Sequence, residues 1–211
     1  KKLFLLDAYA LIYRAYYAFI KNPRINSKGL NTSAMLGFTN TLLDVINNQH
    51  PTHIAVVFDT PGPTERDVIF PAYKANREAT PEDIQLSIPY IKKIIEAFNI
   101  SIIESSGYEA DDIIGTLVKK AEGKGFATYM MTPDKDFGQL VSEKTFIFKP
   151  AKGGNKPEII GVREVCEKYG IRHPNQLIDI LGLWGDAVDN IPGVPGVGEK
   201  TASKLIGEFD S

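Results

Sequence analysis

The chain has 211 residues, enough for one compact domain or one domain with a small appendage. Hydrophobic residues make up 43% of it, but no apolar run approaches the ~20 residues of a membrane-spanning helix, and no signal-peptide pattern opens it. Its single cysteine, Cys166, excludes an internal disulfide and suits a reducing compartment, and we interpret it as a packing residue. The formal net charge of −2 does not by itself point to a nucleic-acid partner.

The first part of the chain alternates short apolar runs with segments of helical spacing. Residues 2–7 form an apolar run that predicts a buried strand, and the last residue of the run is an aspartate. A segment rich in tyrosine and alanine follows and carries Arg14, and residues 35–46 have the apolar spacing of a helix. Residues 53–59 predict a second buried strand, which also ends in an aspartate.

Residues 60–80 do not fit a regular element, because Pro61, Gly62, Pro63 and Pro71 interrupt them. So long a connection inside a compact domain is usually functional or mobile. At residues 80–83, a cap residue, a proline at the first helical position and two acids predict the start of a helix. Residues 101–104 then predict a third strand.

A strongly acidic helix follows this third strand. Apolar residues after position 109 recur at steps of three and four, which predicts one buried face, and the first turn carries Glu109, Asp111 and Asp112. The helix dipole favours an acid there by about 0.3–1 kcal/mol, which would account for one of them. Three crowded carboxylates repel one another, since two unit charges ~4 Å apart cost roughly 4 kcal/mol at an effective dielectric of 20. A nearby cation would relieve that repulsion.

The later part of the chain adds one more acid-ended strand and then becomes helical. Residues 126–131 predict a strand, and Asp134 and Asp136 follow it at once. Helical patterns dominate after that, interrupted by an acidic segment at residues 185–192 and by a glycine-rich turn at residues 193–198.

Strands that alternate with helices predict an α/β fold with a largely parallel central sheet flanked by helices, followed by a small helical region. In open sheets of this kind, ligands bind beyond the carboxyl ends of the strands. Three predicted strands end in aspartates and the acidic helix follows a fourth, so these carboxylates should converge on one edge. A single strand-end aspartate is more often a helix cap or turn residue, but capping does not explain four such sites together. The strand-end residues are Asp7, Asp59, Asp134 and Asp136.

Oxygen ligands determine the chemistry that such a cluster could support. Carboxylates without a cysteine or histidine partner favour Mg²⁺ or Mn²⁺ over zinc, and the three histidines are scattered without ligand spacing. No Ser-His-Asp or Cys-His arrangement is visible, so we predict two ions ~3.5–4 Å apart and hydrolysis of a phosphodiester. A phosphatase or phosphotransferase that uses Asp134 or Asp136 covalently would leave the other acids unexplained.

The net charge is compatible with a nucleic-acid substrate once nine carboxylates are assigned to metal ions. Against 24 basic residues, 17 acidic ones then remain, an excess of 7 positive charges that could contact phosphates. The glycine-rich turn precedes a helix-like tail, and such turns let backbone N–H groups approach a phosphate closely. A plain connector between two helices is the alternative interpretation of this turn. The nine carboxylates are Asp7, Asp59, Glu109, Asp111, Asp112, Asp134, Asp136, Asp186 and Asp189.

Six short motifs occur in order along the chain. They are Leu5-Leu6-Asp7, Val57-Phe58-Asp59, Tyr73-Lys74-Ala75-Asn76-Arg77, Gly107-Tyr108-Glu109-Ala110-Asp111-Asp112, Thr132-Pro133-Asp134-Lys135-Asp136 and Gly185-Asp186-Ala187-Val188-Asp189-Asn190-Ile191-Pro192-Gly193. This series resembles that of the 5′-nuclease (5′-3′ exonuclease) domain at the N-terminus of bacterial DNA polymerase I, within the flap endonuclease family. The resemblance runs through the whole chain, and the series is highly specific.

The resemblance implies a structure-specific, metal-dependent 5′ nuclease that removes 5′ flaps and RNA primers in DNA replication and repair. It implies that one metal ion is bound or supported by Asp7, Asp59, Glu109 and Asp111. It implies that the other is served by Asp134, Asp136 and Asp186, with Asp112 and Asp189 in support. The expected partners are DNA with a 5′ flap or RNA primer and a covalently linked polymerase domain. We therefore expect a monomeric, bacterial, cytoplasmic protein that associates with the nucleoid and not with a membrane.

The same resemblance implies a domain division and a set of DNA contacts. Residues 1–160 would form the nuclease core, with an arch or clamp segment near residues 60–80, and residues 161–211 a helical region with a helix-hairpin-helix motif. Arg14 matches a basic residue near the scissile phosphate. The residues that match the arch, which orients the 5′ strand, are Tyr73, Lys74 and Arg77. The turn that grips the duplex, often with a K⁺ ion, would comprise Gly193, Gly196, Gly198, Lys200 and Thr201.

The sequence departs from the family pattern in two places. Where the family commonly has an aromatic residue, arginine and histidine, this chain has Glu65, Arg66 and Asp67, and two added acids should weaken phosphate affinity. The chain also ends at Ser211, early in the helical region, so we expect a piece of a longer polypeptide. Two other functions remain open: a PIN-type ribonuclease that acts on single-stranded RNA, and a DNA-binding module without metals. The duplex-binding turn argues against the first, and the full set of nine acids argues against the second.

Overall fold

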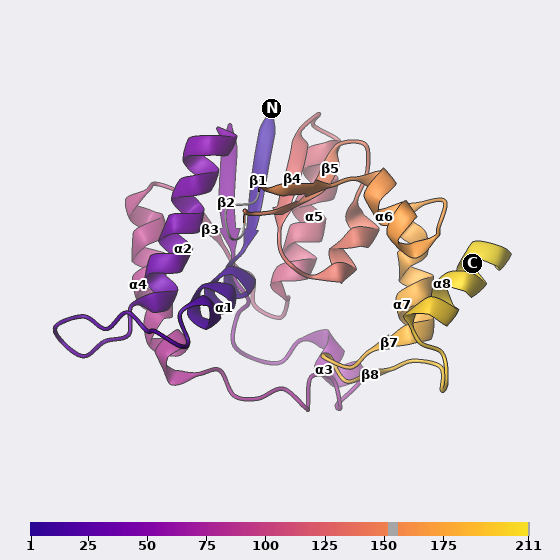
Figure 1. Cartoon of the computed structure of the whole chain (residues 1–211), viewed down its shortest axis with the longest axis horizontal. Helices are drawn as coiled ribbons and strands as arrows, with labels where there is room; N and C mark the ends of the chain where they lie inside the picture. Colours follow the sequence, from indigo (N-terminus) through magenta and orange to yellow (C-terminus); the bar gives the residue numbers. More distant parts are fainter. Residues whose placement is uncertain (152–155, 211) are drawn as a thin grey trace.

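A computed structural model describes residues 1–151 and 156–210. A six-stranded sheet in the order β3-β2-β1-β4-β5-β6 lies at its centre (Figure 1). The first five strands of that order are parallel, and the edge strand β6 pairs antiparallel with β5. The strands are β1 (Lys2–Asp7), β2 (His53–Val57), β3 (Ser101–Ile103), β4 (Ala127–Met131), β5 (Thr145–Lys149) and β6 (Glu158–Ile160). The predicted α/β fold with a largely parallel sheet is therefore confirmed.

Helices cover both faces of this sheet, with α2 and α4 on one side and α5 on the other, and α7 and α8 lie side by side beyond the end of the sheet that β6 forms (Figure 1). Among the described residues, none of the helices is long and apolar enough to cross a membrane. The α-helices are α1 (Ala8–Ala18), α2 (Ser33–Asp44), α3 (Glu65–Ile69), α4 (Glu82–Ala97), α5 (Ala110–Glu122), α6 (Val162–Tyr169), α7 (Leu177–Trp184) and α8 (Glu199–Phe209). The shorter helical turns are the π-helical Val45–Gln49 and the 3₁₀ turns Lys135–Leu140 and Pro174–Gln176.

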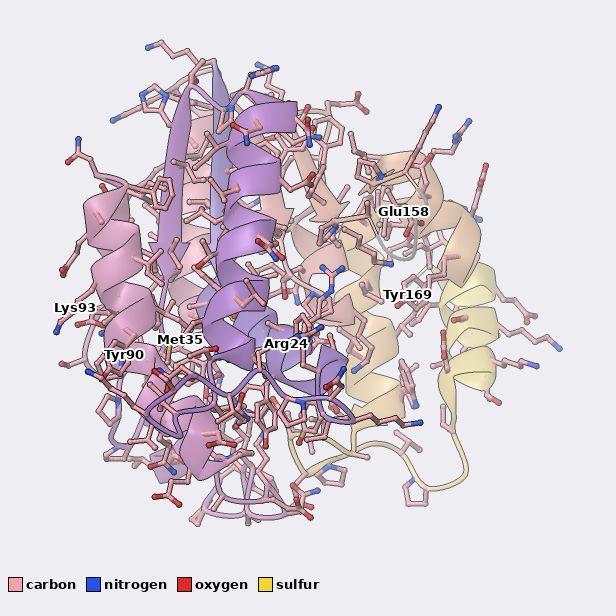
Figure 2. The ribbon with its side chains drawn as sticks, turned by 60° about the vertical axis from the view of Figure 1, so that its left-hand side comes forward. Arg24, Met35, Tyr90, Lys93, Glu158 and Tyr169 are labelled. Carbon is pink, nitrogen blue, oxygen red and sulfur yellow. The ribbon has the colours of Figure 1, made fainter. Side chains whose placement is uncertain are left out.

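The apolar residues of the strands divide between two cores because successive side chains point to opposite faces of a sheet. In β1, Phe4 and Leu6 belong to one core, which α1, α2 and α4 complete, whereas Leu5 belongs to the other. Tyr90 and Lys93 lie on the outer side of α4, away from the sheet (Figure 2). The second core contains apolar residues of α5, α6, α7 and α8. The helical C-terminal region therefore shares a core with the sheet.

The segment between β2 and α4 lies beyond the carboxyl ends of the strands, near the small hairpin β7–β8 (Figure 1). This segment, residues 60–80, is called the arch segment below. It is not wholly irregular, because α3 forms within it. Asp67 accepts hydrogen bonds from the N–H and the hydroxyl of Thr64, 2.6 and 2.8 Å long, which makes a capping box. The predicted start of α4 is wrong by one residue: Pro81 is the N-cap, and the helix begins at Glu82.

Residues 185–192 form a tight hairpin, called the acidic hairpin below, of β7 (Gly185–Asp186) and β8 (Ile191–Pro192). Only glycines fit where it meets α7. A Cβ on Gly193 would lie 2.2 Å from the carbonyl oxygen of Trp184, and Gly185 has φ +78°. The glycine-rich turn follows and leads into α8. Neither the hairpin nor the edge strand β6 was predicted from the sequence.

Candidate active site

Five of the nine predicted carboxylates, from four parts of the chain, line a single cavity of about 700 Å³ at the carboxyl edge of the sheet. Asp7 is the last residue of β1, and Asp59 and Asp134 follow β2 and β4. Glu109 and Asp111 come from the start of α5. These five residues are called the central acids below. The convergence that the strand ends predicted is therefore present for five of the nine carboxylates.

The central acids are crowded and poorly hydrated, which shifts their protonation. Burial, followed by the charges of the other four central acids, raises the pKa of Asp111 to about 8. Burial likewise raises the pKa of Asp7 to about 6. The N–H of Ala10 and the hydroxyl of Thr132 donate to Asp7 over 3.1 and 3.0 Å and oppose that rise. At neutral pH the cavity therefore favours an added cation.

The N-terminus of α5 is tied to the arch segment by a bidentate ion pair. The guanidinium of Arg66 donates two hydrogen bonds of 2.7 Å to Asp112, and they hold the pKa of that carboxyl below its usual range. Asp112 also accepts the N–H of Glu109 over 3.0 Å, and Asp59 accepts the N–H of Ala110 over 2.8 Å. Asp112 thus acts as a capping residue whose charge Arg66 compensates.

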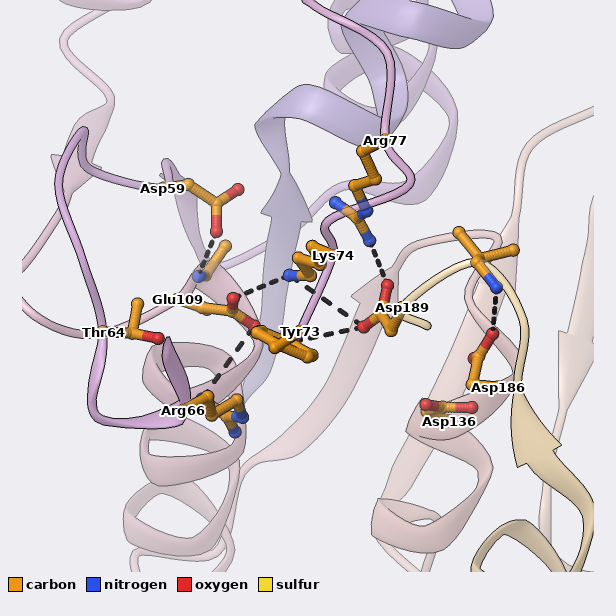
Figure 3. Close-up of polar contacts among 12 residues, drawn as sticks. Asp59, Thr64, Arg66, Tyr73, Lys74, Arg77, Glu109, Asp136, Asp186 and Asp189 are labelled. Atoms are coloured by element: carbon orange, nitrogen blue, oxygen red, sulfur yellow. Dashed lines mark hydrogen bonds and ion pairs between the residues drawn. The ribbon is translucent and has the colours of Figure 1, made fainter. Parts of the chain in front are cut away.

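Basic and phenolic groups of the arch segment bridge the central acids and the acidic hairpin (Figure 3). The hydroxyl of Tyr73 donates to Glu109 over 2.9 Å and lies 3.1 Å from Asp189. The ammonium of Lys74 lies 2.6 Å from Glu109 and 4.0 Å from Asp189. Arg77 forms an ion pair with Asp189. The three predicted arch residues therefore contact predicted metal ligands in this structure.

A second group of acids surrounds Lys135, which separates Asp134 from Asp136 in the sequence. The Lys135 ammonium lies 2.6 Å from Asp186 and 3.4 Å from Asp136, and 5.1 Å from the centre of the Trp184 ring. Burial raises the pKa of Asp136, and the neighbouring Asp134 raises it further. The nine predicted carboxylates thus fall into the central acids, the Lys135 group, and Asp112 and Asp189, each paired with an arginine.

Within the residues that the structure describes, no three carboxylate, imidazole or thiol groups are arranged so that they could hold a metal ion as they stand. Cationic side chains of the chain itself compensate several of the acids. The donor set still fits a hard divalent cation, because it offers buried carboxylate oxygens and no thiol or imidazole. One oxygen of Asp136 is buried and accepts no hydrogen bond in the part of the chain described.

The remaining predicted residues lie outside this cavity. Arg14 donates over 3.2 Å to the carbonyl oxygen of Ala151, in the loop after β5. Gly196, in the glycine-rich turn, has φ +81°, and Gly198 is the N-cap of α8. Lys200 and Thr201 are exposed in the first turn of α8. Their assignments as DNA contacts remain predictions.

Sequence reasoning missed several residues that shape the site. Tyr9, Tyr13 and Tyr17 line the cavity along one side of α1, and their spacing of four residues was a usable signal. Lys135 stands between two acids in the sequence, which could have marked it as their counterion. No sequence signal pairs Arg66 with Asp112, because 46 residues separate them.

Comparison with known proteins identifies the family. Residues 2–170 match the model of the 5′-3′ exonuclease N-terminal resolvase-like domain, and residues 172–211 match that of the 5′-3′ exonuclease C-terminal SAM fold. The chain is 45% identical to DNA polymerase I of Bacillus subtilis, with all of this chain matching 24% of that protein. It is 38% identical to a 5′-3′ exonuclease of Aquifex aeolicus, again over its full length, and covers 71% of that protein. The chain thus spans about a quarter of the length of the DNA polymerase I relatives.

Solved structures show the same fold at lower identity. A T5 5′-exonuclease with divalent zinc ions bound superimposes with a TM-score of 0.78 at 23% identity, covering 99% of this chain and 76% of that one. The catalytic core of Rad2 in complex with a DNA substrate superimposes with a TM-score of 0.63 at 20% identity, covering 100% of this chain and 62% of that one. With its motif series, its sheet and both family models in agreement, the chain belongs to the 5′-3′ exonuclease family.

Proposed function

We propose that this chain is a divalent-metal-dependent 5′ nuclease that hydrolyses phosphodiesters of 5′ flaps and RNA primers during DNA replication and repair. One observation carries the proposal: the central acids line one side of a cavity that Lys74 and Arg77 also line. The acids suit metal ions, and the basic residues suit the phosphate that the ions would act on. Family membership supports hydrolysis over the phosphotransferase alternative.

Two Mg²⁺ or Mn²⁺ ions are the cofactors that this donor set favours. One ion would be held by four of the central acids, Asp7, Asp59, Glu109 and Asp111. Asp134, Asp136 and Asp186 would serve the other ion, with Asp112 and Asp189 in support. When bound, the ions would activate water and stabilise both oxygens of an in-line displacement. The divalent ions bound to the T5 5′-exonuclease support metal dependence here.

The residues of the chain itself would orient the substrate. Lys74 and Arg77 pair with carboxylates in this structure, and cations that neutralise those carboxylates would release both side chains for the phosphates of the displaced strand. Tyr73 would keep its hydroxyl near Glu109 and so hold the arch segment against the site. Arg14 would act near the scissile phosphate only if its side chain leaves Ala151.

Duplex binding would use the glycine-rich turn before α8. Its backbone N–H groups, with Lys200 and Thr201 of the following helix, would contact phosphates without reading the DNA sequence, and a K⁺ ion could assist there. This turn belongs to the helical region that we predict from residue 161 onward. The structurally similar flap endonuclease of T5, solved as a pseudo-enzyme-product complex with DNA and metal ions, supports DNA as the substrate.

The matches to DNA polymerase I support a covalently linked polymerase domain in the full-length protein. In that arrangement the nuclease would remove primers and flaps that strand-displacing synthesis produces. We propose that the nuclease unit acts as a monomer, because the cavity is complete within one chain.

Cleavage assays separate the proposed function from its alternatives. The chain would be incubated with 5′-flap DNA and with single-stranded RNA, each in Mg²⁺ and in EDTA. We expect Mg²⁺-dependent cleavage of the flap and little cleavage of the RNA. Preferential cleavage of RNA would favour a PIN-type ribonuclease. Flap binding without cleavage at any divalent metal concentration would favour a non-catalytic DNA-binding module.

A further inference from the structure

Two asparagine side chains join the arch segment to the acidic hairpin in a reciprocal pair of hydrogen bonds. The amide of Asn76, in the arch segment, donates to the carbonyl oxygen of Ala187 over 2.7 Å. The amide of Asn190, in the hairpin, donates in the opposite direction to the carbonyl oxygen of Ala72, also over 2.7 Å. Each segment thus supplies one donor and one acceptor. This pair of bonds is called the asparagine clasp below.

The backbone between the two bonds is held in an uncommon conformation. The N–H of Lys74 donates to the carbonyl oxygen of Asp189 over 2.9 Å. Lys74 has φ +55° and Asn190 has φ +58°, values that few residues other than glycine adopt. Asparagine is enriched among those few, whereas lysine has no such preference. The clasp therefore holds Lys74 in a backbone geometry that its own residue type does not favour.

Two kinds of contact join these segments, and they respond differently to ions. Arg77 and Lys74 both pair with Asp189 through charges, and both pairs would weaken when metal ions or phosphates bind the same groups. The asparagine clasp joins neutral amides to carbonyl oxygens, so a cation or a phosphate does not neutralise either partner. When the ion pairs open, the clasp remains, together with the backbone hydrogen bond from Lys74 to Asp189 that it flanks.

We propose that Asn76 and Asn190 are positioning residues, which keep the arch segment fastened to the acidic hairpin while Lys74 and Arg77 exchange carboxylates for phosphates. The inference rests on the proposed function, because it concerns the same site. It assigns neither asparagine a contact with metal or DNA. The side chains of Lys74 and Arg77 would change partners while their backbone stays fixed to the acidic hairpin. They would therefore contact the scissile phosphate at the same position in each complex.

The test compares Asn76→Ala, Asn190→Ala and Asn190→Gly with the matched control Asn47→Ala, an exposed asparagine on the turn after α2. Single-turnover cleavage of a 5′-flap DNA in Mg²⁺ gives the maximal rate and the half-saturating enzyme concentration for each. We expect the maximal rate to fall about tenfold in the three clasp variants, with half-saturation changed less than twofold. The double variant Asn76→Ala/Asn190→Ala should lose less than the product of the single losses, because both bonds fasten the same joint.

A second readout does not depend on activity. Amide hydrogen exchange of a peptide that covers residues 72–77 should be faster in each clasp variant than in Asn47→Ala, in EDTA and in Mg²⁺ alike. Unchanged exchange in the clasp variants would overturn the inference. So would an Asn190→Gly variant with the wild-type rate beside an impaired Asn190→Ala, since only the left-handed backbone would then matter.

The remaining outcomes separate this inference from the proposed function. If the wild-type protein cleaves flaps and the clasp variants cleave them at the same maximal rate, the positioning role is overturned and the nuclease assignment stays intact. A weaker flap affinity with an unchanged maximal rate would show that Asn76 contacts DNA directly, which also overturns the inference. Failure of the wild-type protein to cleave any flap in Mg²⁺ would overturn the proposed function and the positioning role with it.

Discussion

Removal of divalent metal should make the stability of this protein fall as the pH rises from 6 to 8. Burial and neighbouring carboxylates raise the pKa of Asp111 to about 8 in the folded chain, whereas an unfolded aspartate titrates near 4. Across that window the folded state binds a proton that the unfolded state has lost. The free energy of unfolding must therefore decrease with increasing pH until the folded-state pKa is passed.

The size of this decrease follows from the number of protons involved. Asp7, whose pKa is raised to about 6, contributes mainly below that pH, so Asp111 alone should act between pH 6 and pH 8. One proton corresponds to roughly 1.4 kcal/mol per pH unit, or at most about 3 kcal/mol over the window. For a chain of this size, 1 kcal/mol shifts the melting temperature by about 2–4 °C. We expect a midpoint at pH 8 that is at most about 6–12 °C below the midpoint at pH 6.

Thermal melts in EDTA and in several millimolar Mg²⁺ measure this effect. Bound cations should favour the ionised carboxylates, remove the decline and add about 2.7 kcal/mol at 100 times the dissociation constant. Asp111→Asn should flatten the decline in EDTA, whereas the exposed Asp179→Asn on α7 should leave it unchanged. The reasoning is refuted if wild-type protein and Asp111→Asn show the same slope in EDTA, or if Mg²⁺ leaves the wild-type slope unaltered.

Three further predictions concern cleavage and DNA binding. Asp134→Asn keeps the side-chain oxygen that accepts the N–H of residue 136, so the fold and flap binding should be preserved. Single-turnover cleavage should fall at least 100-fold, and near wild-type turnover would contradict the metal assignment. Gly196→Ala should weaken binding to all duplexes alike and lower the melting midpoint, because Gly196 has φ +81°. Gly198→Ala, with open space around its Cβ, should leave the midpoint unchanged. Competition assays on unrelated duplexes measure the binding, and a loss confined to one DNA sequence would argue against phosphate contacts. Glu65→Phe should raise flap cleavage modestly at low salt, while Asp67→His should lower it by removing the capping box of α3; equal effects of the two variants would show that charge alone matters.

Local sequence patterns predicted the carboxyl edge well because few residues determine it. An apolar run followed by an aspartate places the acid at a strand end, and parallel strands bring their carboxyl ends to one edge, as Asp7 and Asp59 show. The ion pairs that the acids form with basic side chains could not be predicted. The partners Arg66 and Asp112 are 46 residues apart, and their contact depends on the path of the arch segment. The edge strand β6 was missed because three residues give too short an alternation to detect.

The sequence was incomplete where one residue type has two possible roles. The acids Glu65 and Asp67 suggested repulsion of phosphate, yet Asp67 accepts two hydrogen bonds from Thr64 and caps α3. A carboxylate in the first turn of a helix can cap the backbone as readily as it can face a ligand, and only the local geometry decides between them. The expectation of weakened phosphate affinity stays a prediction for both acids, although Asp67 also has a structural role that the exposed Glu65 lacks.

The core that the sheet shares with the C-terminal helices fixes the distance between the glycine-rich turn before α8 and the acids at the edge of the sheet. Leu177 of α7 and Ile206 of α8 are buried in the same cluster as Leu5 of β1, so the turn before α8 cannot swing freely against the acidic edge. A duplex bound at that turn would present one phosphodiester to the metals. The distance between the turn and the metal site would then determine which bond is cleaved. Leu177→Ala, which opens a cavity at this joint, should then spread the cut over adjacent phosphodiesters. A single cut position in that variant would show that the substrate, and not the core, sets the distance.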